Sequence, residues 1–162
     1  MTKGYALARD EGRAIWFLGG LLTWKAVAEN TAGAYGLVEQ LGPRGFAAPV
    51  HLHEREAEGF YVLEGEVSFI LEDERLQASA GSFVYVPPGA RHAFVVESQQ
   101  AKFLTFINPA HPFEDFVEEL GEPAKSRTIP APLAGPPDLA RIEAAAAKYG
   151  QKTLGPPPAP QR

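Results

Sequence analysis

Short hydrophobic runs, separated by glycine, proline or polar residues, fill the first two thirds of this chain. Runs of this length that are rich in β-branched and aromatic residues are typical of strands, and the breaks between them are typical of turns. The residues before Asn108 show no helical periodicity, which argues against a parallel α/β sheet. Asn30 to Ala34 is expected to be a turn. The pattern predicts an antiparallel barrel or sandwich of roughly nine or ten strands. The runs are 14–18, 21–27, 35–41, two within 45–65, 66–71, 75–78, one within 81–92, 93–96 and 102–107.

Helical periodicity appears only in the last third of the chain. Within 111–121 the apolar residues recur at helical spacing, with a proline near the start and a glycine after the end, which predicts a short amphipathic helix. A second helix is predicted over 139–149, where Asp138 can cap the first turn and Gly150 can end the last. The proline-rich segment 123–137 between them is expected to be an extended connector lying on the barrel, and the prolines of 155–160 exclude a helix or an inner strand.

Length and composition favour a single domain. A chain of 162 residues with 45% hydrophobic content buries one core. We expect it to consist of an N-terminal arm (1–13), a β-barrel (14–108) and a helical, proline-rich extension packed on the barrel (109–162).

Charge and residue usage narrow the class of partner. The net charge of −5 argues against nucleic acid or an anionic membrane as a partner. The sequence has no cysteine, no apolar signal-peptide core near its start, and no run approaching the ~20 apolar residues that span a bilayer. These features predict a cytoplasmic protein.

Three histidines and one glutamate form the leading chemical signal. His51 and His53 are two residues apart, so that in a strand their side chains share a face roughly 6.5 Å apart, and Glu58 can return on the next strand. A Pro-Pro-Gly turn after residue 86 delivers His92 onto the following strand. Three imidazoles and one carboxylate suit a divalent transition metal, and the sequence leaves open whether it is Fe, Mn, Ni, Co, Cu or Zn.

Other interpretations of these histidines remain open. Any one histidine near an apolar strand can be a structural or surface residue, and the whole group can be a degenerate site kept for its shape. His111 lies between Ala110 and Pro112 and belongs to no such group of candidate ligands, so we expect it to be a loop residue.

The spacing of these residues resembles the two motifs of the cupin family. The resemblance implies a double-stranded β-helix, or jelly-roll barrel, which the predicted short helix and C-terminal helix would follow. It also implies pairing through exposed sheet edges, so that we expect a homodimer. The second motif departs at its last position, where Val96 replaces an asparagine that is not a metal ligand in the family. The first motif comprises Gly45, His51, His53, Glu58 and Gly65, and the second Gly81, Pro87, Gly89 and His92.

Four further segments resemble quercetin 2,3-dioxygenase-like cupins: 16–19, 58–65, the phenylalanine-containing helix within 111–121, and 147–157. This resemblance implies cleavage of a flavonol such as quercetin, or of a related aromatic enol, with O₂. His51, His53 and His92 would then hold the metal, and Glu58 would be a fourth ligand, a catalytic base, or both.

An aromatic substrate would need an apolar pocket. Phe60 shares a strand face with Glu58, and Phe94 shares one with His92, so both are expected to point inward. Phe113 and Phe116 on the short helix could close the mouth, and Trp16 is a further candidate. The alternative is that these aromatic residues are ordinary core.

Two other functions remain open. The chain could be another metallocupin enzyme, such as an isomerase, decarboxylase or lyase acting on a small polar substrate. Such a pocket would want a cation beside the metal, for which only Arg55 and Arg91 are near in sequence. The chain could also be a non-catalytic small-molecule-binding cupin.

Overall fold

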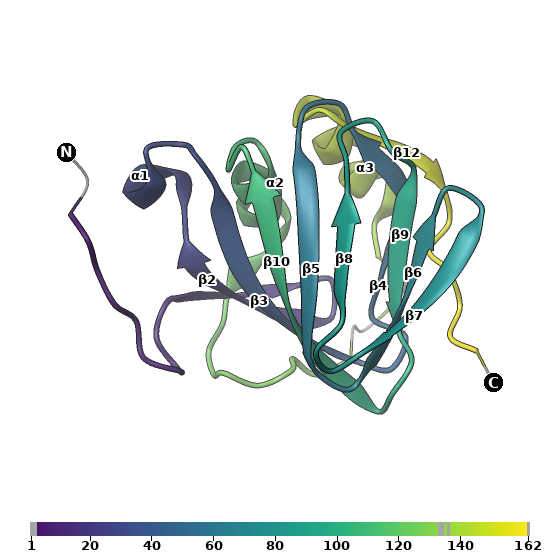
Figure 1. Cartoon of the computed structure of the whole chain (residues 1–162), viewed down its shortest axis with the longest axis horizontal. Coiled ribbons are helices and arrows are strands. Elements are labelled where there is room, and N and C mark those ends of the chain that lie inside the picture. Colours follow the sequence, from purple (N-terminus) through teal and green to yellow (C-terminus); the bar gives the residue numbers. More distant parts are fainter. Residues whose placement is uncertain (1–2, 133–134, 136, 162) are drawn as a thin grey trace.

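The computed structural model describes residues 3–132, 135 and 137–161. Its strands form two antiparallel β-sheets (Figure 1). The all-β prediction is therefore confirmed. In spatial order the seven-stranded sheet contains β11 (Glu122–Pro123), β1 (Arg13–Phe17), β2 (Gly20–Ala26), β3 (Gly36–Pro43), β10 (Gln100–Asn108), β5 (Ala57–Glu64) and β8 (Phe83–Val86). The five-stranded sheet contains β12 (Gln151–Gly155), β4 (Ala47–His53), β9 (His92–Val96), β6 (Glu66–Leu71) and β7 (Glu74–Ser79).

An aromatic cluster joins the two sheets. Phe60 and Phe103 belong to the seven-stranded sheet, whereas Phe69 and Phe94 belong to the five-stranded sheet. The ring centroids of Phe60 and Phe69 are 4.9 Å apart, and those of Phe94 and Phe103 are 5.2 Å apart. All four side chains are buried, so the two sheets are held together by inward-facing rings from alternate strand positions.

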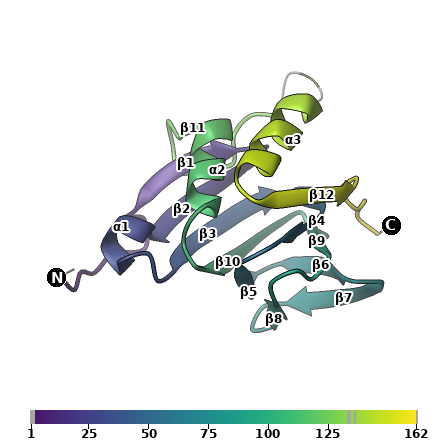
Figure 2. The same ribbon diagram turned by 90° about the horizontal axis from the view of Figure 1, so that it is seen from above.

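Two C-terminal helices lie side by side (Figure 2), the first against β1 of the seven-stranded sheet and the second against β12 of the five-stranded sheet. They are α2 (Phe113–Leu120) and α3 (Leu139–Lys148), and both were predicted. The cap of α3 is also as expected, because the Asp138 carboxylate accepts a hydrogen bond from the Arg141 backbone N–H at 3.1 Å. Part of the predicted connector, residues 133, 134 and 136, lies outside the described residues.

A one-turn helix, α1 (Ala28–Thr31), lies where the sequence predicted only a turn. The Asn30 side chain accepts the Val27 backbone N–H at 2.9 Å, and Ala32 adopts a left-handed conformation with φ of 55° that ends the turn of helix. The expectation that no helix precedes Asn108 was therefore wrong by one turn.

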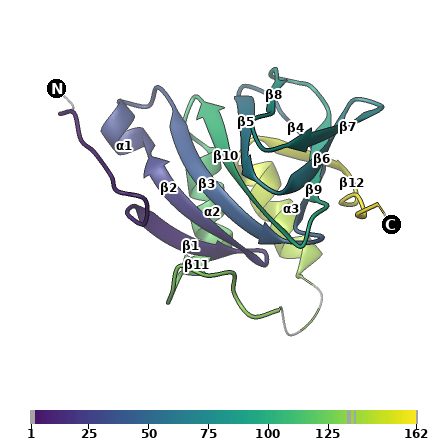
Figure 3. The same ribbon diagram turned by 60° about the horizontal axis from the view of Figure 1, so that its bottom comes forward.

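Two strands were not predicted at all. The two-residue strand β11 pairs with β1, and β12 pairs with β4. In Figure 3 the segment of β12 returns beside β4 after α3, while the two chain ends lie at opposite ends of the molecule. β12 brings the end of the chain beside the strand that carries two of the candidate ligands. Within the described residues, no helix is long and apolar enough to cross a membrane.

Candidate metal centre

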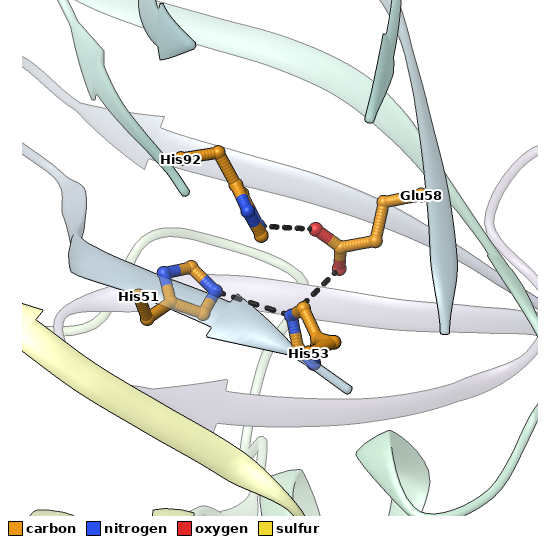
Figure 4. A group of neighbouring side chains, drawn as sticks. All are labelled: His51, His53, Glu58 and His92. Atoms are coloured by element: carbon orange, nitrogen blue, oxygen red, sulfur yellow. Dashed lines mark hydrogen bonds and ion pairs between the residues drawn. The ribbon is translucent and has the colours of Figure 1, made fainter. Parts of the chain in front are cut away.

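Three strands from both sheets bring the four predicted ligands together (Figure 4). His51 and His53 lie on one face of β4, and His92 begins β9 directly opposite His51. Glu58 comes from β5 of the other sheet. One nitrogen or oxygen atom from each side chain lies within 4.8 Å of those of the other three. The site therefore forms where the two sheets meet.

The distances between donor atoms are short. The Nε2 atoms of His51 and His53 are 3.1 Å apart, and His92 Nε2 lies 2.9 Å from the Glu58 carboxylate. The other oxygen of that carboxylate lies 3.6 Å from His53 Nε2. All four residues are buried, so this polar group is enclosed by the protein.

Backbone carbonyl groups orient two of the three imidazoles. His51 Nδ1 lies 2.7 Å from the Pro49 carbonyl oxygen, and His92 Nδ1 lies 3.0 Å from that of Ala90. Each Nδ1–H donates to its carbonyl, so Nε2 is the atom presented to the centre, as metal-binding histidines require. His53 differs, because its Nδ1 is buried without a hydrogen-bond partner among the described residues.

Burial and mutual contact set the charges of the group. Burial, followed by the neighbouring His92 and His53, lowers the pKa of His51 from 6.5 to about 3. Burial also lowers the pKa of His53, although the Glu58 carboxylate opposes this shift. These two imidazoles are therefore neutral near pH 7.

The contact between His92 and Glu58 favours an ion pair instead. Burial acts to lower the pKa of His92, but the hydrogen bond and the charge of Glu58 outweigh burial and raise that pKa. Burial likewise acts to raise the pKa of Glu58, but the histidines outweigh it and hold the pKa at about 2. Both ring nitrogens of His92 face acceptor oxygens, which agrees with a protonated ring.

This donor set fits a divalent transition metal. Two neutral imidazoles and an ionised carboxylate already converge, and His92 needs only to release its Nε2 proton to become the third nitrogen ligand. The Ala90 carbonyl oxygen and the Glu58 carboxylate, which face the two ring nitrogens of His92, favour a positive charge at this point. The group could therefore hold a metal ion, with four side chains from this chain as ligands.

A largely apolar cavity opens beside the four residues, and both His51 and Glu58 lie in its wall. Four of the five aromatic residues predicted for a pocket, Phe60, Phe94, Phe113 and Phe116, also line it. The other residues in the wall are Phe17, Leu18, Gln40, Phe46, Ala47, Ala48, Pro49, Ile142, Ala146, Gln151 and Thr153.

Trp16, the fifth predicted pocket residue, does not line this cavity. Its neighbours Ile15 and Phe17 are buried on the inner face of β1, so Trp16 points to the opposite face by strand alternation. There its indole N–H donates to the Thr128 carbonyl oxygen at 2.9 Å. The same alternation could have identified Phe17 as the β1 residue that lines the cavity.

Two further wall residues were missed by the sequence analysis. Phe46 follows the turn before β4, and its ring packs against that of Phe94 with centroids 5.7 Å apart. Gln151 begins β12 and is 8% exposed. No local signal marks either residue, since each reaches the cavity through a long-range contact.

The remaining candidates lie away from the centre. Arg55 is exposed, and the Arg91 side chain pairs with Asp73 and donates to the Glu72 carbonyl oxygen at 2.8 Å. Neither arginine lines the cavity. His111 is in a turn, with its Nδ1 3.3 Å from the Asp115 carboxylate.

Comparison with known proteins points to one family. Residues 37–107 match the family described as "Cupin domain". The chain is 30% identical over 126 residues to "Quercetin 2,3-dioxygenase" of Bacillus subtilis, an alignment that covers 78% of this chain but only 37% of that protein.

Two solved structures share the fold. An RmlC-like cupin from Shewanella frigidimarina has a TM-score of 0.59 and 24% identity, covering 72% of this chain and 100% of that one. A "predicted oxalate decarboxylase" from Thermotoga maritima also has a TM-score of 0.59, with 20% identity over 65% of this chain and 99% of that one. At these identities the two structures support the fold alone. The sequence motifs, the two-sheet fold and the family match together show that this chain carries a cupin domain and resembles the quercetinase-like cupins.

Proposed function

We propose that this protein is a metal-dependent dioxygenase that cleaves a flavonol, or a related aromatic enol, with O₂. One observation supports this proposal above the others: two of the four candidate ligands, His51 and Glu58, lie in the wall of a cavity whose other lining is mostly aromatic and aliphatic. The likeness to the Bacillus dioxygenase points the same way, although this chain spans about a third of that protein's length (37%).

Each polar residue has a defined role in this proposal. His51, His53 and His92 would hold the metal through Nε2, and Glu58 would complete the set. The bound metal would supply Lewis acidity that lowers the pKa of a coordinated substrate hydroxyl. Because the pKa of Glu58 is lowered to about 2, its carboxylate is ionised at neutral pH, the form that can bind the metal or accept a hydroxyl proton.

The apolar wall would exclude water and orient the ring. Phe60 and Phe94 belong to different sheets, their ring centroids are 6.2 Å apart, and both line the cavity. Phe113 on α2 lies edge-on to His53, with centroids 6.3 Å apart, so that it covers the site. A dry aromatic site favours a planar apolar substrate over a hydrated one.

The same wall argues against a small acid or a phosphorylated sugar as substrate. Among the described residues that line the cavity, none is lysine or arginine. The metal could pair with one charge of such a substrate, but a further buried negative charge would need another cationic partner, which this wall does not offer. The apolar cavity therefore favours the dioxygenase over the other metallocupin activities.

The size of the cavity bears on which enol is accepted. Its volume is about 70 Å³, whereas sites for drug-sized ligands are about 300–1,000 Å³. A flavonol has three rings, so α2 or α3 would have to move outward to admit it. A single-ring enol would need a smaller movement.

The test begins with metal-free protein reconstituted separately with Fe, Mn, Ni, Co, Cu or Zn. Oxygen uptake and substrate absorbance are then followed with quercetin and with a single-ring aromatic enol. We expect O₂ consumption that is abolished in His51→Ala and in Glu58→Gln. Phe113→Ala, which removes the ring above His53, should raise turnover of the larger substrate relative to the smaller one.

Metal binding without O₂ consumption by any reconstituted form would contradict the dioxygenase and favour another metallocupin reaction. Failure to bind any of the six metals would favour a non-catalytic binding protein. A homodimer and a cytoplasmic location stay predictions.

A further inference from the structure

The three histidines of the centre are not supported equally. His51 and His92 each place Nδ1 against a backbone carbonyl oxygen, from Pro49 and Ala90 respectively. His53 is 1% exposed, yet its Nδ1 has no hydrogen-bond partner among the described residues. A metal-binding imidazole almost always donates its second N–H to an acceptor, which fixes the tautomer and the ring orientation. The centre therefore lacks one such acceptor, at His53.

Gln151 is the residue opposite His53 across the β4–β12 pair. Directly opposed side chains of antiparallel strands share a face and have Cβ atoms about 4.5–5.5 Å apart. The next residues of this face agree with the register, because Thr153 lies opposite His51 and lines the cavity with it. The Gln151 amide is therefore held on the face of the sheet that carries the His53 imidazole.

The Gln151 side chain is also missing a partner. Its Nε2 atom is buried and makes no hydrogen bond among the described residues. Two buried, unpartnered polar atoms thus lie on opposed residues of one strand pair, and each such atom costs about 1–3 kcal/mol when left unsatisfied. A primary amide can serve either tautomer of the histidine, because rotation about its last bond exchanges an N–H donor for a carbonyl acceptor.

From this placement we infer that Gln151 is a positioning residue for the metal centre: its amide oxygen accepts the His53 Nδ1–H and so holds Nε2 free to bind the metal. In the absence of metal, His53 Nε2–H can donate to His51 Nε2, 3.1 Å away, and the amide N–H can then donate to His53 Nδ1. The inference rests on the proposed metal site. It gives the C-terminal strand β12 a function that the cupin motifs themselves do not include.

The test measures Zn²⁺ affinity by competition with a chromophoric chelator, in the full-length chain. Gln151→Leu keeps the shape of the side chain but removes the acceptor, and should bind Zn²⁺ about 10- to 100-fold more weakly. Gln151→Glu keeps an acceptor and should stay within about threefold of the wild type or bind more tightly. Lys152→Leu is the matched control, on the same strand but on its exposed opposite face, and should bind Zn²⁺ as tightly as the wild type.

A second measurement does not depend on the variants. In the Zn²⁺-loaded wild type labelled with ¹⁵N-histidine, the Nδ1 proton of His53 should exchange slowly with solvent and show a nuclear Overhauser effect to the Gln151 side chain. Rapid exchange of that proton would overturn the inference even if Gln151→Leu failed to fold.

The outcomes separate this inference from the proposed function. Equal Zn²⁺ affinities for the wild type and Gln151→Leu would overturn the role of Gln151 and leave the metal site in place. An equal loss in Gln151→Glu and Gln151→Leu would also overturn it, because the acceptor would then be irrelevant. A wild type that binds no metal would remove the proposed function and this inference together.

Discussion

Acid should destabilise the metal-free protein through His51. Its pKa is lowered from 6.5 to about 3, chiefly by burial and then by His92 and His53. In the unfolded chain the imidazole regains its ordinary pKa, so between these two values the unfolded state binds a proton that the folded state does not. The free energy of unfolding therefore decreases as the pH falls below 6.5.

The size of the effect follows from the shift. One proton contributes at most about 1.4 kcal/mol per pH unit, and because the unfolded imidazole is only half protonated at pH 6.5, His51 alone should remove about 2 kcal/mol between pH 6.5 and pH 4.5. The lowered pKa of His53 adds to this loss with the same sign. For a domain stabilised by about 5–15 kcal/mol, this is a large fraction of the total.

Glu58 and His92 do not cause the loss of stability between pH 6.5 and pH 4.5. The pKa of Glu58 is lowered from 4.5 to about 2, so its contribution is present above pH 4.5 and is lost only as the pH falls below that value. The pKa of His92 is raised, so its contribution is present below pH 6.5 and is lost only as the pH rises. Burial raises the pKa of Glu56, which acts with the opposite sign inside the window and makes a comparison with a variant necessary.

The assay is urea denaturation of the chelator-treated wild type and of His51→Asn at several pH values between 6.5 and 4.5. The asparagine cannot titrate, while Glu56 and His53 remain in both proteins. We expect the wild type to lose up to about 1.4 kcal/mol more per pH unit than the variant. Equal slopes for the two proteins would refute the conclusion that His51 is buried in its neutral form.

Two further predictions concern the cavity wall and metal binding. A Cβ at Gly42 would overlap the ring of Phe46, so Gly42→Ala should cost about 1–3 kcal/mol of stability, measured by urea denaturation. Gly4→Ala, with no atom within 4 Å of the new Cβ, should change little, and equal effects would contradict the packing argument. Zn²⁺ binding near neutral pH should release a proton from His92 Nε2, which a pH indicator can detect. His92→Ala should release fewer protons per Zn²⁺ bound, and an equal number in the variant and the wild type would argue against an ion-paired His92.

The sequence predicted most strands and both longer helices because their signals are local. Short apolar runs bounded by glycine, proline or polar residues mark β1 to β3, and the Asp138 cap and Gly150 bracket α3 within one residue. β12 could not be found in this way. Its residues become a strand because β4 offers an unpaired edge, and that edge exists only after the two sheets have formed.

The candidate site shows the same division between local and long-range information. Motif spacing located His51, His53, Glu58 and His92, and strand parity placed Phe60 and Phe94. On β1, strand alternation places Phe17 and not Trp16 on the face that lines the cavity.

The aromatic cluster beneath the site has a consequence for metal binding. Three ligands belong to the five-stranded sheet and Glu58 belongs to the other, so the distance between the sheets sets the distance between carboxylate and imidazoles. The rings of Phe60 and Phe94 lie two residues along the chain from Glu58 and His92, and they fill the gap between the sheets at this level. Because packed interiors resist compression and expansion, these rings fix the carboxylate close to the three histidines before any metal binds. The cupin motifs therefore supply the ligands, and the core packing supplies the spacing that makes them one site.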